Sequence, residues 1–176
     1  DYEMQESYED ACLQWRVVFR SEFPTYDETL VTVRRLENRF PSVDEQWIED
    51  RYPVQIDSSL NLRIESLVNK EGWRVASRLR DALTAFHGKL PKSAKVEFRA
   101  VIDNASNYNF RWKVRNLSIE AQKDGKLRGK IEPPTSHQAV YKDSTAFEGT
   151  HYVECYAIKD GVVVARKKEF VPIGDN

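Results

Sequence analysis

The sequence predicts an α+β protein in which a mostly helical N-terminal part, with one short strand, precedes a C-terminal antiparallel β-sandwich. Two observations predict this order. Apolar residues recur every three or four positions in much of the first half of the chain, and at alternate positions from Lys95 onward. In addition, Asp160-Gly161 separates two alternating runs, and an Asp-Gly pair is typical of a tight β-hairpin.

A helix is expected over residues 1–20, because four apolar residues are spaced four, three and four apart. These residues are Tyr8, Cys12, Trp15 and Phe19. The segment is rich in acidic residues and begins without Met, so residues 1–29 are interpreted as a helical connector to an upstream domain that this chain lacks. The apolar side of the helix packs either on that domain or on the core of this chain.

Residues 30–92 are expected to form a helical subdomain. A helix over residues 29–40 ends at Pro41, and a capping box formed by Ser42 and Glu45 predicts a short helix over residues 43–52. Alternation of apolar and polar residues predicts a strand over residues 60–65, and helical spacing predicts a helix over residues 75–86.

Residues 93–176 are expected to form a β-sandwich subdomain that resembles the immunoglobulin class. The alternating runs cover residues 96–102, 110–115, 127–131, 152–159 and 162–170. Several short antiparallel strands with brief turns favour two packed sheets. Gly129 interrupts one of these runs, which predicts a β-bulge or a close approach of another backbone segment.

Composition limits the function classes. The 176 residues include 40% hydrophobic and 31% charged residues, with a net charge of -1. No stretch has the roughly 18 consecutive apolar residues of a membrane span, and two isolated cysteines fit a reducing cytoplasm. The first 90 residues carry 12 basic and 17 acidic side chains, and the remainder carry 15 basic and 11 acidic ones. Halves of opposite sign either have different roles or attract each other.

Catalytic motifs are missing from the sequence. It has no phosphate-binding loop, no dinucleotide-binding glycine motif and no nucleophile elbow, and it has no Gly-Ser pair of the kind a nucleotidyltransferase needs. The three histidines are too scattered to predict a metal site. We therefore expect no enzyme activity and no cofactor in this chain.

Basic residues at strand spacing form the strongest candidate binding feature. The rows are Arg111, Lys113 and Arg115; Lys126, Arg128 and Lys130; and Arg166 and Lys168. Residues two apart in a strand share a face, so neighbouring rows would form a basic surface able to bind phosphate. The alternative is an ordinary solvated sheet face, because lysine and arginine commonly occupy such positions.

Two further residues are candidate ligand contacts. Tyr152 alternates with Val153, so Tyr152 either faces a surface site where a base can stack or packs internally. His151 can exchange hydrogen bonds with a ligand, although a lone histidine at the start of a strand also serves a structural role. The candidate ligand-binding residues are Arg111, Lys113, Arg115, Arg128, His151 and Tyr152.

Several blocks of sequence resemble one known family, the adenylyl/guanylyl cyclase and SMODS C-terminal sensor domain (AGS-C). The most distinctive blocks are Trp112-Lys113-Val114-Arg115-Asn116, Leu127-Arg128-Gly129 and Gly149-Thr150-His151-Tyr152. Further blocks lie at residues 33–43, 47–49, 52–53, 62–64, 69–74, 159–161 and 164–166. The resemblance covers about residues 30–174, in the order of the family.

The resemblance implies a non-catalytic sensor of a nucleotide or cyclic (oligo)nucleotide second messenger in bacterial anti-phage (CBASS) signalling. Its implied partners are that ligand and a fused upstream synthase or effector domain, with no membrane segment in this fragment and homo-oligomer formation left open. The alternative is a protein-interaction or oligomerisation module that recognises a protein partner or phage component. Stabilisation by nucleotides would favour the sensor, and concentration-dependent association without nucleotide binding would favour the module.

Overall fold

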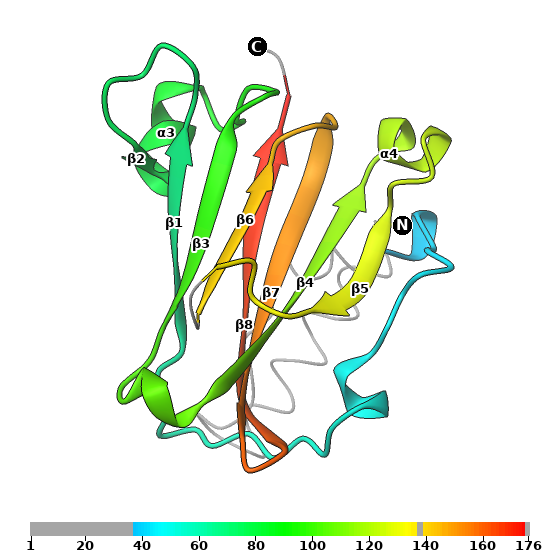
Figure 1. Cartoon of the computed structure of the whole chain (residues 1–176). Helices are drawn as coiled ribbons and strands as arrows, with labels where there is room; N and C mark the ends of the chain where they lie inside the picture. Colours follow the sequence, from blue (N-terminus) through cyan, green and yellow to red (C-terminus); the bar gives the residue numbers. More distant parts are fainter. Residues whose placement is uncertain (1–36, 137–138, 175–176) are drawn as a thin grey trace, which may run out of the picture. The chain divides into compact units, whose positions relative to one another are not determined.

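The computed structural model describes residues 37–136 and 139–174. The chain divides into two compact units, residues 1–39 and 40–176. In the first unit, residues 37–39 have helical backbone, and the helices expected over residues 1–20 and 29–40 otherwise lie outside the described residues. The second unit contains two four-stranded antiparallel sheets, drawn as arrows in Figure 1.

The first sheet has the strand order β2-β1-β3-β6. Its strands are β1 (Arg63–Asn69), β2 (Ser77–Arg78), β3 (Lys95–Val101) and β6 (Val140–Ser144). Strand β1 pairs with β3 along its whole length, from Arg63 opposite Val101 to Asn69 opposite Lys95. Strand β2 is much shorter and pairs with Leu67 and Val68. Alternate residues of β1 and β3 are buried, as the period-two pattern of β3 predicts.

The second sheet has the order β5-β4-β7-β8. Its strands are β4 (Asn109–Leu117), β5 (Arg128–Glu132), β7 (Gly149–Lys159) and β8 (Val162–Ile173). Asp160 and Gly161 join β7 to β8 with φ values of 51° and 81°, as a two-residue hairpin with both φ angles positive requires. The predicted hairpin is confirmed.

The remaining elements are short. They are the 3-10 helices η2 (Ile48–Asp50) and η3 (Ala105–Asn107) and the helices α3 (Leu79–Ala85) and α4 (Ile119–Lys123). The hydroxyl of Ser118 accepts a hydrogen bond of 3.1 Å from the Ala121 N–H and so caps α4. No helix in the described part of the chain is both long and apolar enough to cross a membrane.

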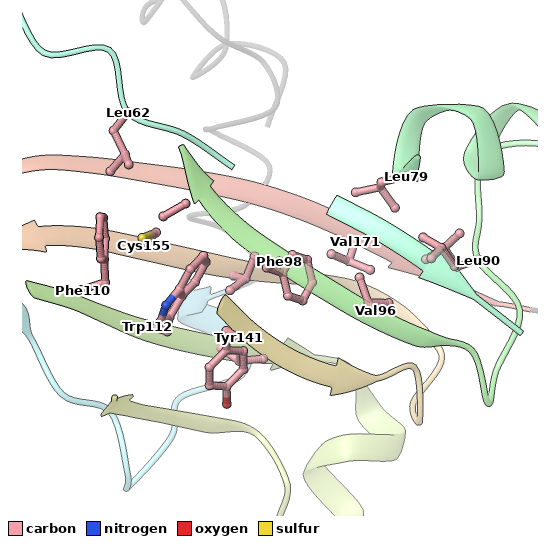
Figure 2. Packing of buried hydrophobic residues seen from close by; sticks show 14 of the residues in the cluster. Leu62, Leu79, Leu90, Val96, Phe98, Phe110, Trp112, Tyr141, Cys155 and Val171 are labelled. Carbon is pink, nitrogen blue, oxygen red and sulfur yellow. The ribbon is translucent and has the colours of Figure 1, made fainter. Parts of the chain in front are cut away.

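The core lies between the two sheets. Val96 and Phe98 of β3 belong to the same buried cluster as Phe110 and Trp112 of β4 (Figure 2). Trp112 is fully buried and stacks on Tyr141 of β6, with ring centroids 5.9 Å apart. Trp112 therefore faces inward, and the basic residues that alternate with it face the outer side of the second sheet.

Residues 40–57, which we name the strap, cross that outer side. Ile48 of the strap packs in a second buried cluster with Ile131 and Tyr156 of the sheet. The N–H groups of Gln55 and Asp57 donate to the carbonyls of Val163 and Val164. The strap thus covers part of the outer face through both apolar contacts and backbone hydrogen bonds.

The expected helical character of residues 30–92 is not supported. The helix expected over residues 43–52 is limited to the three residues of η2, and the helix expected over residues 75–86 is limited to α3. The strand expected over residues 60–65 begins at Arg63, continues to Asn69 and joins the same sheet as β3. Packing of the strap and of β1 against the β-rich part explains the difference, because tertiary contacts outweigh weak local helix signals.

Candidate anion-binding site

The central basic row of β4 faces the strap. Lys113 and Arg115 are only 1% and 0% exposed. Arg111, at the open end of the row, is half-buried and donates to the carbonyl of Phe110 at 2.9 Å. Two of the three cations are therefore enclosed by protein.

One carboxylate of the strap pairs with both enclosed cations. The Lys113 ammonium forms an ion pair with one oxygen of Glu45, and the Arg115 Nε lies 2.7 Å from the other oxygen. The Glu45 side chain is only 16% exposed. The Lys113 Nζ also lies 4.5 Å from the ring centroid of Trp47, where the ring face attracts a cation. Among the described residues, Glu45 is the only acid paired with either cation.

Arg115 fastens three segments together. Its Nη1 donates to the carbonyls of Leu127 and Arg128, each at 3.1 Å, and its Nη2 donates to the carbonyl of Phe40 at 2.7 Å. With the Glu45 ion pair, this guanidinium joins β4, the start of β5 and the first residue of the strap. Its five donors in a fixed plane suit such a role.

Gly129 allows the strap to approach the sheet. The pairing of β4 with β5 shifts register between Lys113 and Arg115, opposite Gly129, so the predicted bulge is confirmed. A Cβ atom at Gly129 would lie 3.0 Å from the Glu45 Cα, so the predicted close backbone approach is also confirmed. The Gln46 N–H donates to the Gly129 carbonyl at 3.0 Å, and the Gln46 side-chain oxygen accepts from the Ile131 N–H at 2.9 Å.

Other acids of the strap meet outward basic residues of the sheet. Asp44 lies 3.3 Å from Lys130, and Glu49 lies 3.3 Å from Arg166. Both pairs are exposed and so contribute little to stability. Together with the Glu45 pairs, these contacts join acidic residues of the first half of the chain to basic residues of the second half. Mutual attraction was one of the two expectations from the opposite charges of the two halves.

Arg128 faces away from the strap. It has a φ of 60°, which is uncommon for a residue with a side chain, and the bulge beside it turns its guanidinium toward the first sheet. There it pairs with Asp143, donates to the Tyr141 hydroxyl at 2.5 Å and lies 3.4 Å from Glu132. Burial alone would lower the pKa of Arg128, but the charge of Asp143 and its other partners raise it. Arg128 therefore links the rims of the two sheets.

Tyr141 completes this network. Its hydroxyl donates a hydrogen bond to Glu132. Burial first, and then this hydrogen bond, raise the pKa of Tyr141, so its phenol is neutral at physiological pH. The network is a structural tie made of one cation, two carboxylates and one phenol.

His151 and Tyr152 lie on opposite sides of β7. His151 is 3% exposed, and its Nε2 lies 2.7 Å from the carbonyl of Phe147, which requires an N–H at that nitrogen. Burial lowers the pKa of His151, so the ring is neutral. Tyr152 is also buried, and the Lys168 ammonium lies 3.9 Å from its ring centroid.

His151 lines a small cavity between the sheets, together with Asn116, Asp143 and Thr145. The cavity volume of about 30 Å³ is enough for a water molecule and too small for a nucleotide. His151 is therefore placed for a structural role.

The structure does not bring the six predicted residues into one pocket. Arg111, Lys113, Arg115 and Tyr152 belong to the outer side of the second sheet, whereas the side chains of Arg128 and His151 reach the inner side. Sequence reasoning missed Glu45 as a functional candidate. Its position in the Ser42–Glu45 capping box was the available signal, but that pattern predicts a helix start rather than a partner for two buried cations.

Comparison with known proteins identifies one family. A search of curated proteins finds no match to this chain. The model of the adenylyl/guanylyl and SMODS C-terminal sensor domain family matches residues 42–174, which include most of the strap and both sheets. The expected family resemblance is confirmed, and this chain belongs to the AGS-C sensor domain family.

Proposed function

We propose that this domain is a non-catalytic sensor that binds a nucleotide or cyclic (oligo)nucleotide second messenger. In this proposal it acts in bacterial anti-phage signalling and regulates a fused cyclase, nucleotidyltransferase or effector. The observation that carries the proposal is the buried cluster in which Lys113 and Arg115 pair with the single carboxylate of Glu45.

The charges of this cluster favour a phosphate ligand. Two cations and one carboxylate leave one positive charge without a paired acid among the described residues. Such a charge in a poorly solvated site strongly favours an additional or more highly charged anion. A phosphate has more acceptor oxygens than a carboxylate and binds arginine and lysine through charge-assisted hydrogen bonds. A phosphate can therefore replace Glu45 in this cluster.

Replacement of Glu45 supplies a means of regulation. Glu45 and the Phe40 carbonyl both hold the strap to Arg115. Residues 1–39 precede the strap in the sequence and would connect it to the proposed upstream domain. A ligand that displaces Glu45 loosens the strap. The ligand then favours the loosened arrangement because it binds that arrangement more tightly, as any regulatory ligand must.

The remaining predicted residues have different roles in this proposal. Arg111 is the half-buried cation at the open end of the row, so it makes the first contact with an incoming phosphate. Tyr152 and Lys168 stack beside the cluster on the neighbouring strands. Arg128 and His151 hold the inner side of the sheet in place and do not contact the ligand.

Calorimetric titration with cyclic mononucleotides and cyclic dinucleotides tests the proposal. We expect Lys113→Met to abolish binding, because it removes one of the two enclosed charges. Glu45→Gln removes the competing carboxylate and should tighten binding by about tenfold, while lowering the Tm of the free protein because two buried cations lose their partner.

Asp44→Asn is the matched control, since it changes the neighbouring strap acid and its exposed ion pair with Lys130 only. It should leave the affinity unchanged. If folded wild-type and Glu45→Gln proteins both fail to bind every nucleotide, the sensor mechanism proposed here is wrong.

A specific observation also favours the second function, a protein-interaction module. Within the described ranges, one edge of the first sheet has backbone groups that no neighbouring strand pairs, and an open groove lies beside it.

A further inference from the structure

The edge of β1 is only partly covered. Strand β2 pairs with Leu67 and Val68, which leaves residues 63–66 without a neighbouring strand on that side in the described part of the chain. Figure 1 shows β1 at the margin of its sheet, with β2 and α3 beside its upper part only. A groove of about 330 Å³ runs along this edge, and its walls include the consecutive residues 64–67 and 78–80.

The peptide groups at this edge point outward. In β3, the Ala100 N–H donates to the Ala139 carbonyl on the side of β6, so the peptide groups of Ala100 point away from β1. Ala100 lies directly opposite Ile64, which is therefore in a non-hydrogen-bonded pair. The N–H and C=O of Ile64 consequently point to the open edge, and those of Ser66, two residues later, do the same.

The charged side chains at the edge can pair with the same side chains of a second copy of the chain. Arg63 and Glu65 are exposed on the outer face of the sheet, on either side of Ile64. If two copies of β1 pair antiparallel about Ile64, the two Ile64 residues exchange hydrogen bonds. Arg63 of each copy then lies opposite Glu65 of the other, in the closer, non-hydrogen-bonded type of pair.

We infer that the β1 edge is a homodimerisation surface, on which a second copy of this chain adds its own β1 strand with Ile64 opposite Ile64. Registers centred on the next two residues of β1 are less favourable. Pairing about Glu65 would place two like charges in contact, and pairing about Ser66 would place strand residues 64 and 65 of the second copy in the space in which β2 pairs with Leu67 and Val68. The resulting eight-stranded sheet would fill the groove and satisfy the outward peptide groups.

Sedimentation analysis of the 176-residue chain over a range of concentrations tests this inference. We expect a monomer–dimer equilibrium in the wild type. Arg63→Glu or Glu65→Arg alone turns both attractive pairs into repulsive ones, so each should raise the dimer dissociation constant by about tenfold. The exchange variant R63E/E65R restores both pairs and should recover the wild-type dissociation constant.

Mixing the two single variants gives an independent check. The Arg63→Glu and Glu65→Arg proteins are complementary to each other, so they should form a mixed dimer more readily than either forms a homodimer. Lys89→Glu is the control, because Lys89 pairs with Glu148 and neither residue lines the groove at the open edge. Circular dichroism confirms that each variant is folded.

Two results would overturn the inference. One is a wild-type chain that stays monomeric at every concentration. The other is a dimer whose dissociation constant does not respond to the charge exchange, which would place its interface on another surface. Neither result bears on nucleotide binding at the strap, since the two tests alter different residues.

Discussion

At the scale of single residues, the bulge of β5 determines what each basic side chain contacts. Arg128 and Gly129 are neighbours in sequence, but Arg128 pairs with Asp143 of the first sheet, whereas Gly129 lies against Glu45 of the strap. The extra residue of a bulge re-aims side chains in this way. Sequence spacing alone treats Arg128 and Lys130 as one row, so the opposite directions of their side chains could not be foreseen.

Replacement of Gly129 by alanine tests the fit of the strap. Gly129 has a φ of +127°, and a Cβ there would lie 3.0 Å from Glu45 Cα and 3.3 Å from the Arg115 side chain. We expect Gly129→Ala to lower the free energy of unfolding by about 3 kcal/mol, since backbone strain adds to this contact. Urea denaturation measures the change.

Gly125→Ala is the matched control for this substitution. Gly125 also has a positive φ, of +64°, but apart from its two chain neighbours no described residue has an atom within 4 Å of the position of its Cβ. Its replacement should cost only about 1 kcal/mol, from backbone strain alone. Equal losses for the two variants would show that the strap does not limit the space at Gly129.

At the scale of elements, the strands were predictable and the strap was not. Strands β3, β4, β7 and β8 have apolar residues at alternate positions because one side of each faces the core. Strand β5 differs, since its Ile131 packs with Ile48 of the strap on the outer side. Strand β6 was missed, since it is short and carries Lys142 and Asp143. The capping box formed by Ser42 and Glu45 predicted a helix in the strap. The strap is held instead by its contacts with the second sheet, which a local sequence pattern cannot predict.

The loop between β6 and β7 should respond to pH through His151. Burial lowers the pKa of His151 below its usual value of 6.5, so the unfolded chain binds a proton at a higher pH than the folded chain does. The free energy of unfolding should therefore fall as the pH drops below 6.5. The negative charges of Asp143 and Glu120 raise the pKa of His151 and so reduce this loss of stability.

Urea denaturation at pH 7.5 and 5.5 measures this dependence. His151→Gln keeps an N–H donor of similar reach for the Phe147 carbonyl but does not titrate, so its free energy of unfolding should fall less. His87→Gln changes an exposed histidine and should retain the wild-type dependence. If His151→Gln retains it as well, another group titrates in this range.

At the scale of the whole molecule, charge was the most informative property of the sequence. The excess of acid in the first half and of base in the second predicted either separate roles or mutual attraction, and Asp44, Glu45 and Glu49 show the attraction. The composition could not show that the acids come from one short segment, because that depends on the path of the chain. The same limit applies to the six candidate residues, which share sequence blocks but not one pocket.

The second unit should fold without the first. Residues 40–174 contain both sheets and the buried cluster between them, so a chain that begins at Phe40 retains the main core. We expect this shortened chain to show a β-rich circular dichroism spectrum and a single cooperative urea transition. A chain that instead begins at Leu60 lacks the strap and should be less stable, because Lys113 and Arg115 lose Glu45. Equal stability of the two chains would show that the strap contributes little.

The junction at residues 127–129 has a consequence for how such domains can vary. Within three consecutive positions, the backbone carbonyl of Leu127 meets Arg115, the side chain of Arg128 meets the opposite layer, and the bare Cα of Gly129 meets the strap. Each of these three positions contacts a different segment. A compensating substitution that restores one contact therefore does not restore the other two. Insertion or deletion of a single amino acid there would disturb three layers at once, whereas the Asp160-Gly161 turn connects only two strands.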